Sequence, residues 1–290
     1  MRTVVISGVS SGIGRAATAA LVEKGFFVFG SVRREEDAAS LVAAYPDHFR
    51  PLIFDVTDEA AIAANAEIVS AAIGNDYLAG LVNNAGIGVS GPMLLQPMSE
   101  IRKTFDVNLF APIAMVRQFA GMLGADRGRS GAKGRVVNIT SVAGRMAGPF
   151  LGAYCGSKHA LEAVSDSMRR ELMLYGIDVV VIGPGGVDTA IAHKGEAQMG
   201  PYDDTDFGKA IRAADGDLIG KIRAGHKPET IGRAIADALT LPAPKARYAL
   251  VKNRIRDWTI PLSLPKRTVD RLLAKQYGLR PSDLPSSERN

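Results

Sequence analysis

Short apolar runs alternate with longer helical stretches along the first 186 residues of the chain. The runs are rich in Val, Ile, Phe and Leu: "TVVISG" from residue 3, then "FFVFGSV", "PLIFDV", "LAGLVNNAG", "GRVVNITS" and "IDVVVIGPGG". Helices are expected between them, over residues 13–24, 35–45, 58–73, 99–124 and 152–175. Strands that alternate with helices predict a parallel sheet, and strands that are apolar throughout are buried on both faces. We therefore predict an α/β fold: a single doubly wound Rossmann-type domain over residues 1–290, with about seven strands and helices on both faces.

The alternation ends after "GPGG". Residues 189–227 are rich in Gly and Asp, and we expect an irregular segment that covers the substrate as a loop or lid. A helix is expected from Pro228, followed by a last strand, "RYALV", and an amphipathic helix that ends near Gly278. Residues 245–290 form a C-terminal extension, which is basic because residues 245–280 carry ten Lys/Arg against two Asp.

Features that would indicate a membrane span, secretion or a metal site are missing from the sequence. The first strand begins at residue 3, which leaves no room for a signal peptide, and no apolar run approaches the roughly 20 residues that cross a bilayer. The single cysteine, Cys155, and the four scattered histidines lack the spacing of a zinc site. We expect a cytoplasmic protein without a metal.

A glycine-rich loop, "SGVSSGIG" at residues 7–14, lies between the first strand and the first helix. At this place, glycines let backbone N–H groups and a helix N-terminus approach a pyrophosphate. The spacing differs from G-x-G-x-x-G, and a glycine cluster can also be a plain tight turn. Its position favours dinucleotide binding, with these residues as candidates: Ser7, Gly8, Ser10, Ser11, Gly12, Ile13 and Gly14.

The residues after the second strand indicate which nucleotide is bound. In dinucleotide folds an acid at this place accepts the ribose 2′-hydroxyl of NAD, whereas an arginine accommodates the 2′-phosphate of NADP. Here Val32 is followed by Arg33 and Arg34. Arg33 therefore favours NADP(H) over NAD(H), and a solvated turn is the alternative, more so for Arg34.

Several motifs together resemble the classical short-chain dehydrogenase/reductase family. They are the glycine loop, "NNAG" at 83–86, Asn108 in "DVNLF", Ser141 in "NITS", "YCGSK" at 154–158 and "PGGVDT" at 184–189. The match covers roughly residues 3–190, and Ser7 replaces the threonine of most members. The stretch around 149–182 and the later "RYAL" and "LLAKQYGL" look most like the hydroxysteroid/retinol dehydrogenase-like branch, which acts on hydrophobic alcohols and ketones.

The resemblance implies roles for particular residues. Asn108, Ser141, Tyr154 and Lys158 would be catalytic: Tyr154 as general acid/base, Lys158 lowering the pKa of its phenol and holding the nicotinamide ribose, Ser141 bonding the substrate oxygen and Asn108 steadying a water in a proton relay. Further cofactor contacts are implied for Asp55, Val56, Asn83, Ala85, Gly86, Pro184, Gly185, Val187 and Thr189. Plausible substrate-pocket residues are Met146, Phe150, Met199 and Tyr202, although such residues are more often plain core.

The chain contains Tyr-x-x-x-Lys twice, at Tyr154/Lys158 and at Tyr248/Lys252. On a helix, residues four apart share a face with β-carbons about 5–6 Å apart, whereas on a strand they lie about 13 Å apart. Only the first pair is expected on a helix, and only it has a serine thirteen residues upstream, Ser141. We assign the chemistry to the first pair and interpret Tyr248 as an edge-strand aromatic and Lys252 as a solvated cation.

The sequence thus predicts an NADP(H)-dependent oxidoreductase that interconverts an alcohol and a ketone or aldehyde on a hydrophobic, steroid- or retinoid-like substrate. A 3-oxoacyl-carrier-protein reductase is the alternative enzyme, although such reductases usually end soon after the last strand. A nucleotide-sensing regulator is the alternative outside enzymology, which the complete catalytic set argues against. The family implies a homodimer or homotetramer through the helices 99–124 and 152–175. The basic extension is interpreted as solvated surface, ahead of a peripheral membrane contact and of nucleic-acid binding.

Overall fold

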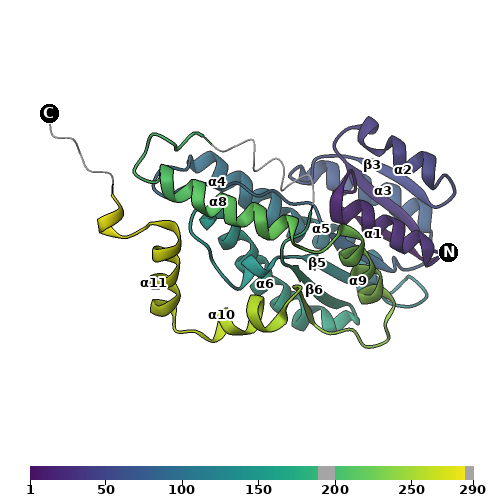
Figure 1. Cartoon of the computed structure of the whole chain (residues 1–290). Helices are drawn as coiled ribbons and strands as arrows, with labels where there is room; N and C mark the ends of the chain where they lie inside the picture. The colour runs from purple at the N-terminus through teal and green to yellow at the C-terminus, as the bar shows by residue number, and fades with distance from the viewer. Residues whose placement is uncertain (189–199, 285–290) are drawn as a thin grey trace.

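The computed structural model describes residues 1–188 and 200–284, and its centre is a seven-stranded parallel sheet (Figure 1). The strand order is β3-β2-β1-β4-β5-β6-β7, and every neighbouring pair is parallel. The predicted α/β fold with a doubly wound parallel sheet is confirmed. The strands are β1 Thr3–Ile6, β2 Phe27–Val32, β3 Phe49–Ile53, β4 Gly80–Asn83, β5 Arg135–Ile139, β6 Asp178–Pro184 and β7 Arg247–Leu250.

One face of the sheet is covered by α1 (Gly12–Glu23), α9 (Pro228–Thr240) and the short α2 (Ala39–Ala44). Apolar residues of these helices pack against Val4, Ile6 and Val28 of the sheet. Figure 1 shows α1 and α9 side by side, and Gly232 permits this because a β-carbon there would lie 2.6 Å from the backbone of Ala16.

The other face is covered by α3 (Glu59–Ile73), α5 (Ala111–Ala120) and α6 (Gly152–Leu172). Ile62, Met115 and Phe119 are buried there against Val5 and Leu81. The strands have apolar residues on both faces because both faces are covered, which explains why no period-two alternation is visible in the sequence.

The helix expected over 99–124 is interrupted by two π-helical turns. It consists of α4 (Met98–Phe105), the π-turn η2 (Asp106–Phe110), α5 and a second π-turn, η3 (Gly121–Ala125). A π-turn inserts an extra residue into the helix and is frequent at functional sites. The first one contains Asn108.

The expectation of an irregular segment over residues 189–227 is wrong for its second half. Residues 208–223 form α8 (Gly208–Arg223), which packs through Ala210 and Ile211 on Phe150. Phe150 itself lies in the loop before α6, with φ +64° and its ring 6.0 Å from that of Phe207. This amphipathic helix was not expected from a segment with many Gly and Asp residues, because its buried side is mostly alanine and isoleucine. Residues 189–199 lie outside the described residues.

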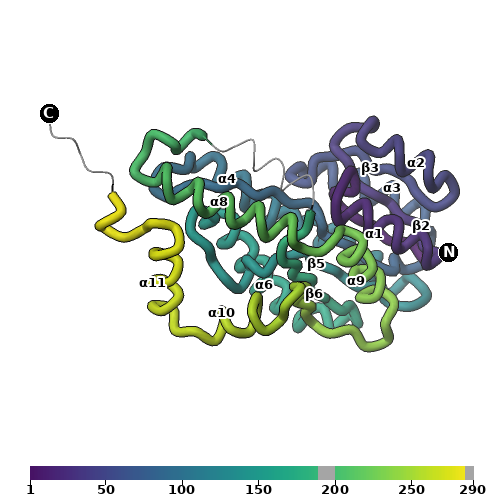
Figure 2. Tube along the Cα trace, in the orientation of Figure 1, coloured from purple at the N-terminus to yellow at the C-terminus, as the bar shows by residue number. Residues whose placement is uncertain are grey.

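The C-terminal extension runs along the edge of the molecule as a separate arm (Figure 2). After β7 the chain forms η6 (Ile255–Thr259), α10 (Ile260–Ser263) and α11 (Lys266–Tyr277). The last helix ends at Gly278, as expected, and this glycine is left-handed with φ +70°. Tyr277 ties α11 to α8, because its hydroxyl donates to Asp217 at 2.7 Å.

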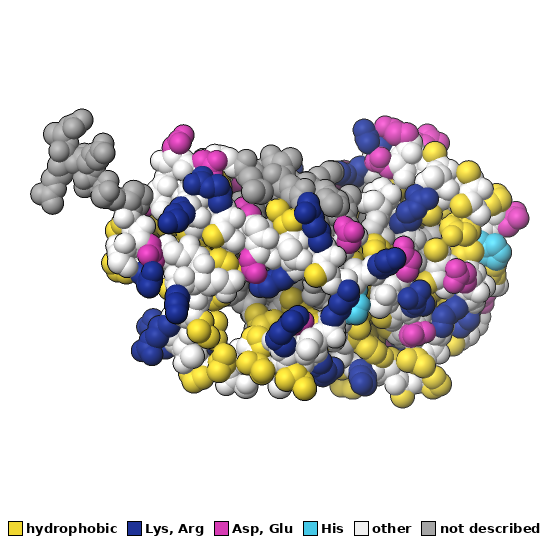
Figure 3. All heavy atoms as spheres, in the orientation of Figure 1, with side chains coloured by type: hydrophobic (Ala, Val, Ile, Leu, Met, Phe, Trp, Pro, Cys, Tyr) yellow, Lys and Arg dark blue, Asp and Glu magenta, His cyan; other side chains and the backbone are white. Residues whose placement is uncertain are grey.

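The arm is mostly exposed. In Figure 3, apolar side chains gather where Figure 1 places α10. Lysines and arginines surround them. Exposed apolar residues of η6 and α10 are Ile255 (68% exposed) and Ile260 (47% exposed). Among the described residues, no helix is both long and apolar enough to cross a bilayer.

Candidate active site

The loop between β1 and α1 has the geometry that glycine permits. Gly8 and Gly12 have φ values of +70° and +57°, which side chains rarely adopt. A β-carbon on Gly14 would lie 2.2 Å from the carbonyl oxygen of Gly8, so only glycine lets α1 begin this close to the loop. Ser10 and Ser11 are exposed, Ile13 is partly buried, and Ser11 is the residue that precedes α1. The loop therefore presents an exposed backbone turn and a helix N-terminus, which suits a pyrophosphate.

Two side chains tie this loop to the end of β4. The Ser7 hydroxyl accepts hydrogen bonds from the backbone N–H groups of Asn84 and Ala85, both at 3.0 Å. The Asn84 amide donates to the carbonyl oxygens of Ser7 (2.9 Å) and Gly8 (2.8 Å). The sequence analysis missed Asn84, although it lies inside the "NNAG" motif. Its polar side chain next to a strand end was the available signal.

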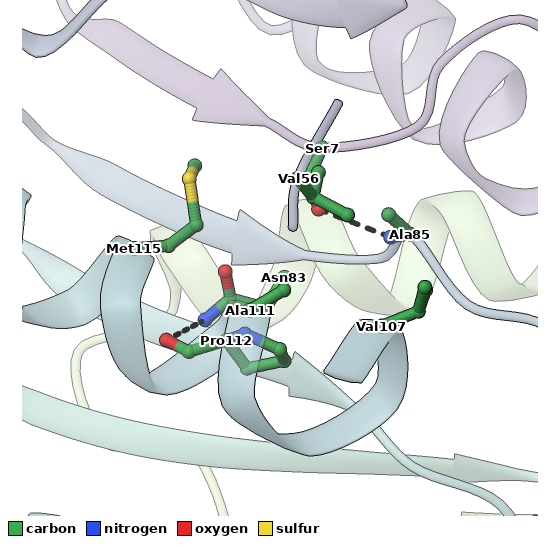
Figure 4. A pocket seen from close by; sticks show the side chains of 8 residues that line it. All are labelled: Ser7, Val56, Asn83, Ala85, Val107, Ala111, Pro112 and Met115. Carbon is green, nitrogen blue, oxygen red and sulfur yellow. Dashed lines mark hydrogen bonds between the residues drawn. The ribbon is translucent and has the colours of Figure 1, made fainter. Parts of the chain in front are cut away.

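A small recess lies below this loop (Figure 4). Its lining is largely apolar, and the buried amide of Asn83 donates to Asn138 at 2.8 Å while its oxygen has no partner among the described residues. Ala85 lies beside Ser7, to whose hydroxyl its N–H donates, and Val107 precedes Asn108 in the π-turn. The full lining is Ser7, Val56, Asn83, Ala85, Val107, Ala111, Pro112 and Met115. Asn83 therefore connects β4 to β5, and its contact with the cofactor stays a prediction.

Arg33 and Arg34 differ in their surroundings. The Arg34 guanidinium pairs with Asp37 at 2.9 Å and with Glu36 at 3.4 Å. Arg33 is exposed, and its charge acts on Asp55 at the end of β3. Burial acts to raise the pKa of Asp55, but the hydrogen bonds from Thr57 and the charge of Arg33 outweigh it, so the pKa is lowered. Of the two arginines, Arg33 is therefore the one whose charge reaches Asp55, as that of Lys103 also does.

Tyr154 and Lys158 lie one turn apart on α6. Lys158 is 4% exposed, its ammonium donates to the carbonyl oxygen of Ile139 at 3.0 Å, and it lies 6.0 Å from the centroid of the Tyr154 ring. Burial lowers the pKa of Lys158 to about 8, against the upward effect of Glu162. The amine is thus fixed beside the phenol and titrates within reach of neutral pH.

The pKa of Tyr154 is raised rather than lowered. Burial is the main cause, and the Ser141 hydroxyl acts in the opposite direction. In the protein alone, loss of water outweighs the hydrogen bond of Ser141. The phenol is therefore protonated and can donate. The lowering that we expect from Lys158 together with the oxidised nicotinamide stays a prediction.

Ser141 begins the short η4 turn (Val142–Gly144) at the end of β5. Its hydroxyl accepts from the N–H of Ala143 at 3.1 Å and lies 3.4 Å from the carbonyl oxygen of Pro184, to which it can donate. Pro184 is buried at the end of β6, and Gly185 and Val187 follow it. Thr189 lies outside the described residues. The structure thus brings Ser141 together with the segment expected to hold the nicotinamide.

Asn108 is completely buried in the π-turn. Its side-chain oxygen accepts from the N–H of Ile87 at 2.9 Å, and its amide donates to the carbonyl oxygen of Ile87 (2.9 Å) and to Ser157 (3.0 Å). The side chain therefore connects the segment after β4 to α6. A role in a proton relay stays a prediction.

Gly86 keeps a space open at the centre of this group. A β-carbon there would lie 3.3 Å from the Asn108 oxygen and 3.5 Å from the Lys158 nitrogen, and one on Gly88 would lie 3.7 Å from the Tyr154 ring. Side chains at these positions would fill the room in front of the lysine. The residues present therefore fit a nicotinamide nucleotide that runs from the glycine loop to Lys158.

The second Tyr-x-x-x-Lys pair is placed differently. Tyr248 lies on β7, the edge strand, and its hydroxyl accepts from the N–H of Lys245 at 3.0 Å. Lys252 is exposed beyond the strand end. The structure brings Ser141 next to Tyr154 and not next to Tyr248.

The remaining candidates surround the site without polar chemistry. Cys155 is buried, and burial raises the pKa of its thiol, so it stays neutral. Phe150 is buried, Met146 and Tyr202 are partly buried, and the Tyr202 hydroxyl lies near Gly91. Met199 lies outside the described residues. Within the part of the chain that is described, no three His, Cys, Asp or Glu side chains gather as metal ligands.

Known proteins are similar to this chain in sequence and in fold. Over 275 residues, 95% of this chain and 97% of the relative, the chain is 38% identical to the NADPH-dependent 3-dehydrocapnine reductase of Ornithobacterium rhinotracheale. It is 34% identical to retinol dehydrogenase 16 of Mus musculus over 284 residues, 93% of this chain and 87% of the relative. A solved short-chain dehydrogenase from Streptomyces avermitilis superposes with a TM-score of 0.74 at 28% identity, covering 96% of both chains.

A second solved structure, a metagenomic short-chain oxidoreductase in complex with NADP, superposes with a TM-score of 0.66 at 25% identity and covers 86% of this chain and 96% of that one. The sequence pattern of the short chain dehydrogenases matches residues 2–200. The chain belongs to the short-chain dehydrogenase family and is an oxidoreductase that interconverts alcohols and carbonyl compounds with a nicotinamide nucleotide.

Proposed function

We propose that the protein is an NADP(H)-dependent reductase and dehydrogenase of a hydrophobic ketone or aldehyde and its alcohol, with Tyr154 as the general acid/base. One observation carries the proposal: a protonated Tyr154 lies on α6 beside a buried Lys158 and near Ser141, in front of a space that Gly86 keeps open. When bound, the nucleotide supplies the hydride. The protein must then supply the proton and the place for the carbonyl oxygen.

In the reductive direction, Tyr154 donates its proton to the carbonyl oxygen as negative charge develops there. Ser141 donates a hydrogen bond to the same oxygen, exchanging its present acceptor, the carbonyl oxygen of Pro184. Lys158, held by Ile139, stabilises the phenolate that remains. The raised pKa of Tyr154 favours this direction, because the group begins as a proton donor.

NADP(H) is the proposed cofactor because Arg33 is an exposed cation at the end of β2, whereas Arg34 is already paired. The similar 3-dehydrocapnine reductase is named as NADPH-dependent, which supports the same preference. NAD(H) is the alternative. Arg33 would bind the 2′-phosphate, and Asp55 and Val56 would lie beside the adenine.

Replacing Arg33 with alanine is expected to lower kcat/KM for NADPH by about 10–100-fold, because a charge-assisted hydrogen bond to phosphate is worth about 1.5–3 kcal/mol. The value for NADH should change little, because NADH has no 2′-phosphate. Arg34→Ala is the matched control, since its guanidinium is engaged by Asp37. Steady-state kinetics with both nucleotides measures the ratio. An equal loss in the two variants would contradict the assignment.

The proposed substrate is lipophilic, steroid- or retinoid-like. Phe150, Tyr202 and the apolar side of α8 lie beside the site, and relatives are named retinol dehydrogenases. A 3-oxoacyl-carrier-protein reductase remains the alternative enzyme, and a nucleotide-sensing regulator the alternative without turnover. The arm after β7 favours the first, because carrier-protein reductases usually end near the last strand.

The assembly proposed is a homodimer or homotetramer that pairs through the helix pair α4–α5 and α6. The exposed Phe110 of the π-turn (55% exposed) supports an apolar contact there. For the basic extension, we retain a solvated surface as the interpretation and a peripheral membrane contact as the alternative.

A further inference from the structure

A buried ion pair lies one helical turn beyond the catalytic lysine. Glu162 of α6 is 6% exposed, and Arg247 of β7 donates to both its carboxylate oxygens, at 2.8 Å through Nε and at 2.9 Å through Nη2. Thr140 adds a third hydrogen bond at 2.6 Å. A two-pronged arginine–carboxylate pair of this kind has a fixed geometry. The Glu162 and Arg247 side chains therefore hold each other in a fixed geometry.

The backbone leaves room for this pair. A β-carbon on Gly183 would lie 2.5 Å from the Arg247 guanidinium, and one on Gly144 would lie 2.9 Å from the Glu162 side chain. Gly183 is in β6, and Gly144 ends the turn that Ser141 begins. The strand and turn that carry the active site are thus built around the pair.

The Glu162–Arg247 pair is connected to the active site through α6 and through the turn of Ser141. Tyr154, Lys158 and Glu162 follow one another at intervals of four residues on one face of α6. At the turn, Nη2 of Arg247 lies 3.5 Å from the carbonyl oxygen of Ser141. The charge of Glu162 favours the ammonium form of Lys158 and opposes the effect of burial.

The pair also reaches the C-terminal arm. The Arg247 guanidinium lies over the ring of Trp258 in η6, 4.4 Å from the centroid. Trp258 is the single tryptophan of the chain. A stacked aromatic ring holds a guanidinium in place while leaving its N–H groups available for the carboxylate.

We propose that Glu162 and Arg247 are positioning residues that together set the charge of Lys158, with Glu162 favouring the ammonium form and Arg247 opposing it, and that they fix the turn of Ser141. Trp258 clamps Arg247, so that the C-terminal arm is part of the active-site support. The proposal deepens the proposed function and rests on Lys158 serving Tyr154. The charge on Lys158 depends on the balance between Glu162 and Arg247, and that balance depends on the arm.

Other charged groups lie on the elements that pack against α6. Besides Lys158 and Glu162, the titratable residues of α6 itself are Tyr154, Cys155, His159, Asp166, Arg169, Arg170 and Glu171. Around it, α4 and η2 carry charged side chains, η4 is followed by Arg145, and Asp178 begins β6. The α4 and η2 residues are Glu100, Arg102, Lys103 and Asp106. Among the described residues, burial lowers the pKa of Lys158, and the charge that opposes this effect is that of Glu162. Glu162 is thus the charge to change.

The test titrates Lys158 in the free protein, without nucleotide or substrate. Acetic anhydride reacts with the neutral amine only, so peptide mass spectrometry of Lys158 acetylation against pH gives the midpoint directly. Glu162→Gln removes the carboxylate and leaves Arg247, so the midpoint should fall. Arg247→Met leaves the carboxylate unneutralised, so the midpoint should rise. Glu162→Gln with Arg247→Met should lie between, and the two single variants should differ by about one pH unit or more.

The alkaline limb of the pH profile of kcat/KM should move in the same order. If both single variants shift in one direction, or neither shifts, the pair is only structural and the proposal is overturned. The double variant leaves no unpaired charge, which keeps the test valid if a single variant folds poorly. Failure of the proposed function would be recognised separately. If the Lys158 midpoints follow the expected order but the protein reduces no carbonyl, the positioning role of the pair stands and the proposed activity is rejected.

Trp258 tests the role of the arm. Trp258→Leu should shift the Lys158 midpoint in the direction of Arg247→Met and by less, while Trp258→Phe, which keeps the stacking, should restore it. In Arg247→Met, the emission of Trp258 should change because its stacking partner is lost. The control is Arg256→Met, which breaks an exposed pair with Asp257 on the same arm and should alter neither readout. An unchanged emission in Arg247→Met, together with an unchanged Lys158 midpoint in Trp258→Leu, would overturn the clamp.

Discussion

Tyr154→Phe is expected to lower kcat for carbonyl reduction by about 10²–10⁴-fold, the usual contribution of a general acid. Removing one hydroxyl leaves the ring and the packing of α6 in place, so nucleotide binding should be retained. Tyr248→Phe removes a hydroxyl that accepts only from the turn at Lys245, so its activity should equal that of the unaltered protein. Steady-state rates and a fluorescence titration with NADPH measure both quantities.

The two tyrosines form a matched pair, because each precedes a lysine by four residues. An unchanged rate in Tyr154→Phe, or a loss confined to Tyr248→Phe, would show that the chemistry lies elsewhere. A loss of NADPH binding together with activity in Tyr154→Phe would indicate a structural role instead.

Lys158→Met is expected to abolish most activity and yet to stabilise the fold. In the folded protein the pKa of Lys158 falls from 10.5 to about 8, so burying its charge costs about 3 kcal/mol at neutral pH. The hydrogen bond to Ile139 offsets about 1 kcal/mol of this, which leaves a net gain of about 2 kcal/mol in the free energy of unfolding. Urea denaturation measures it, alongside kcat.

The gain has a defined dependence on pH. Because the folded pKa is below the unfolded one, the unfolded chain binds more protons between about 8 and 10.5, and the unaltered protein becomes more stable as the pH rises through this window. The advantage of Lys158→Met should therefore be complete below pH 8 and disappear toward 10.5. Lys252→Met, at the exposed lysine, should change stability by less than about 0.5 kcal/mol at any pH. A destabilised Lys158→Met would contradict the account.

The fold was predictable because its signals are local. Apolar runs and intervening helices define strands and helices independently of the rest of the chain, and the sheet order follows from a doubly wound topology. The candidate site could also be predicted, because Ser141, Tyr154 and Lys158 have the spacing of residues that a strand end and the following helix bring together. Only a helix places Lys158 beside Tyr154, and this separated the two Tyr-x-x-x-Lys pairs.

The rest depends on contacts between distant segments. Arg247 meets Glu162 across 85 residues, and nothing in the local sequence of either residue indicates the other. The direction of the Tyr154 pKa depends on burial, which is produced by the whole fold. The helix α8 was not predicted because only a few of its residues are buried. Phe150, on which it packs, lies in a loop 58 residues before the first residue of α8.

The reaction that we propose is hydride transfer from NADPH to a hydrophobic carbonyl, with Tyr154 supplying the proton. Its most direct test incubates the protein with NADPH deuterated at C4 and a set of steroid, retinoid, aliphatic and β-ketoacyl carbonyls, and locates the deuterium in the products by mass spectrometry. The account predicts deuterium on the carbinol carbon of a steroid- or retinoid-like alcohol, and none with Tyr154→Phe. Tight binding of NADPH without deuterium in any product would contradict it and favour the nucleotide-sensing regulator.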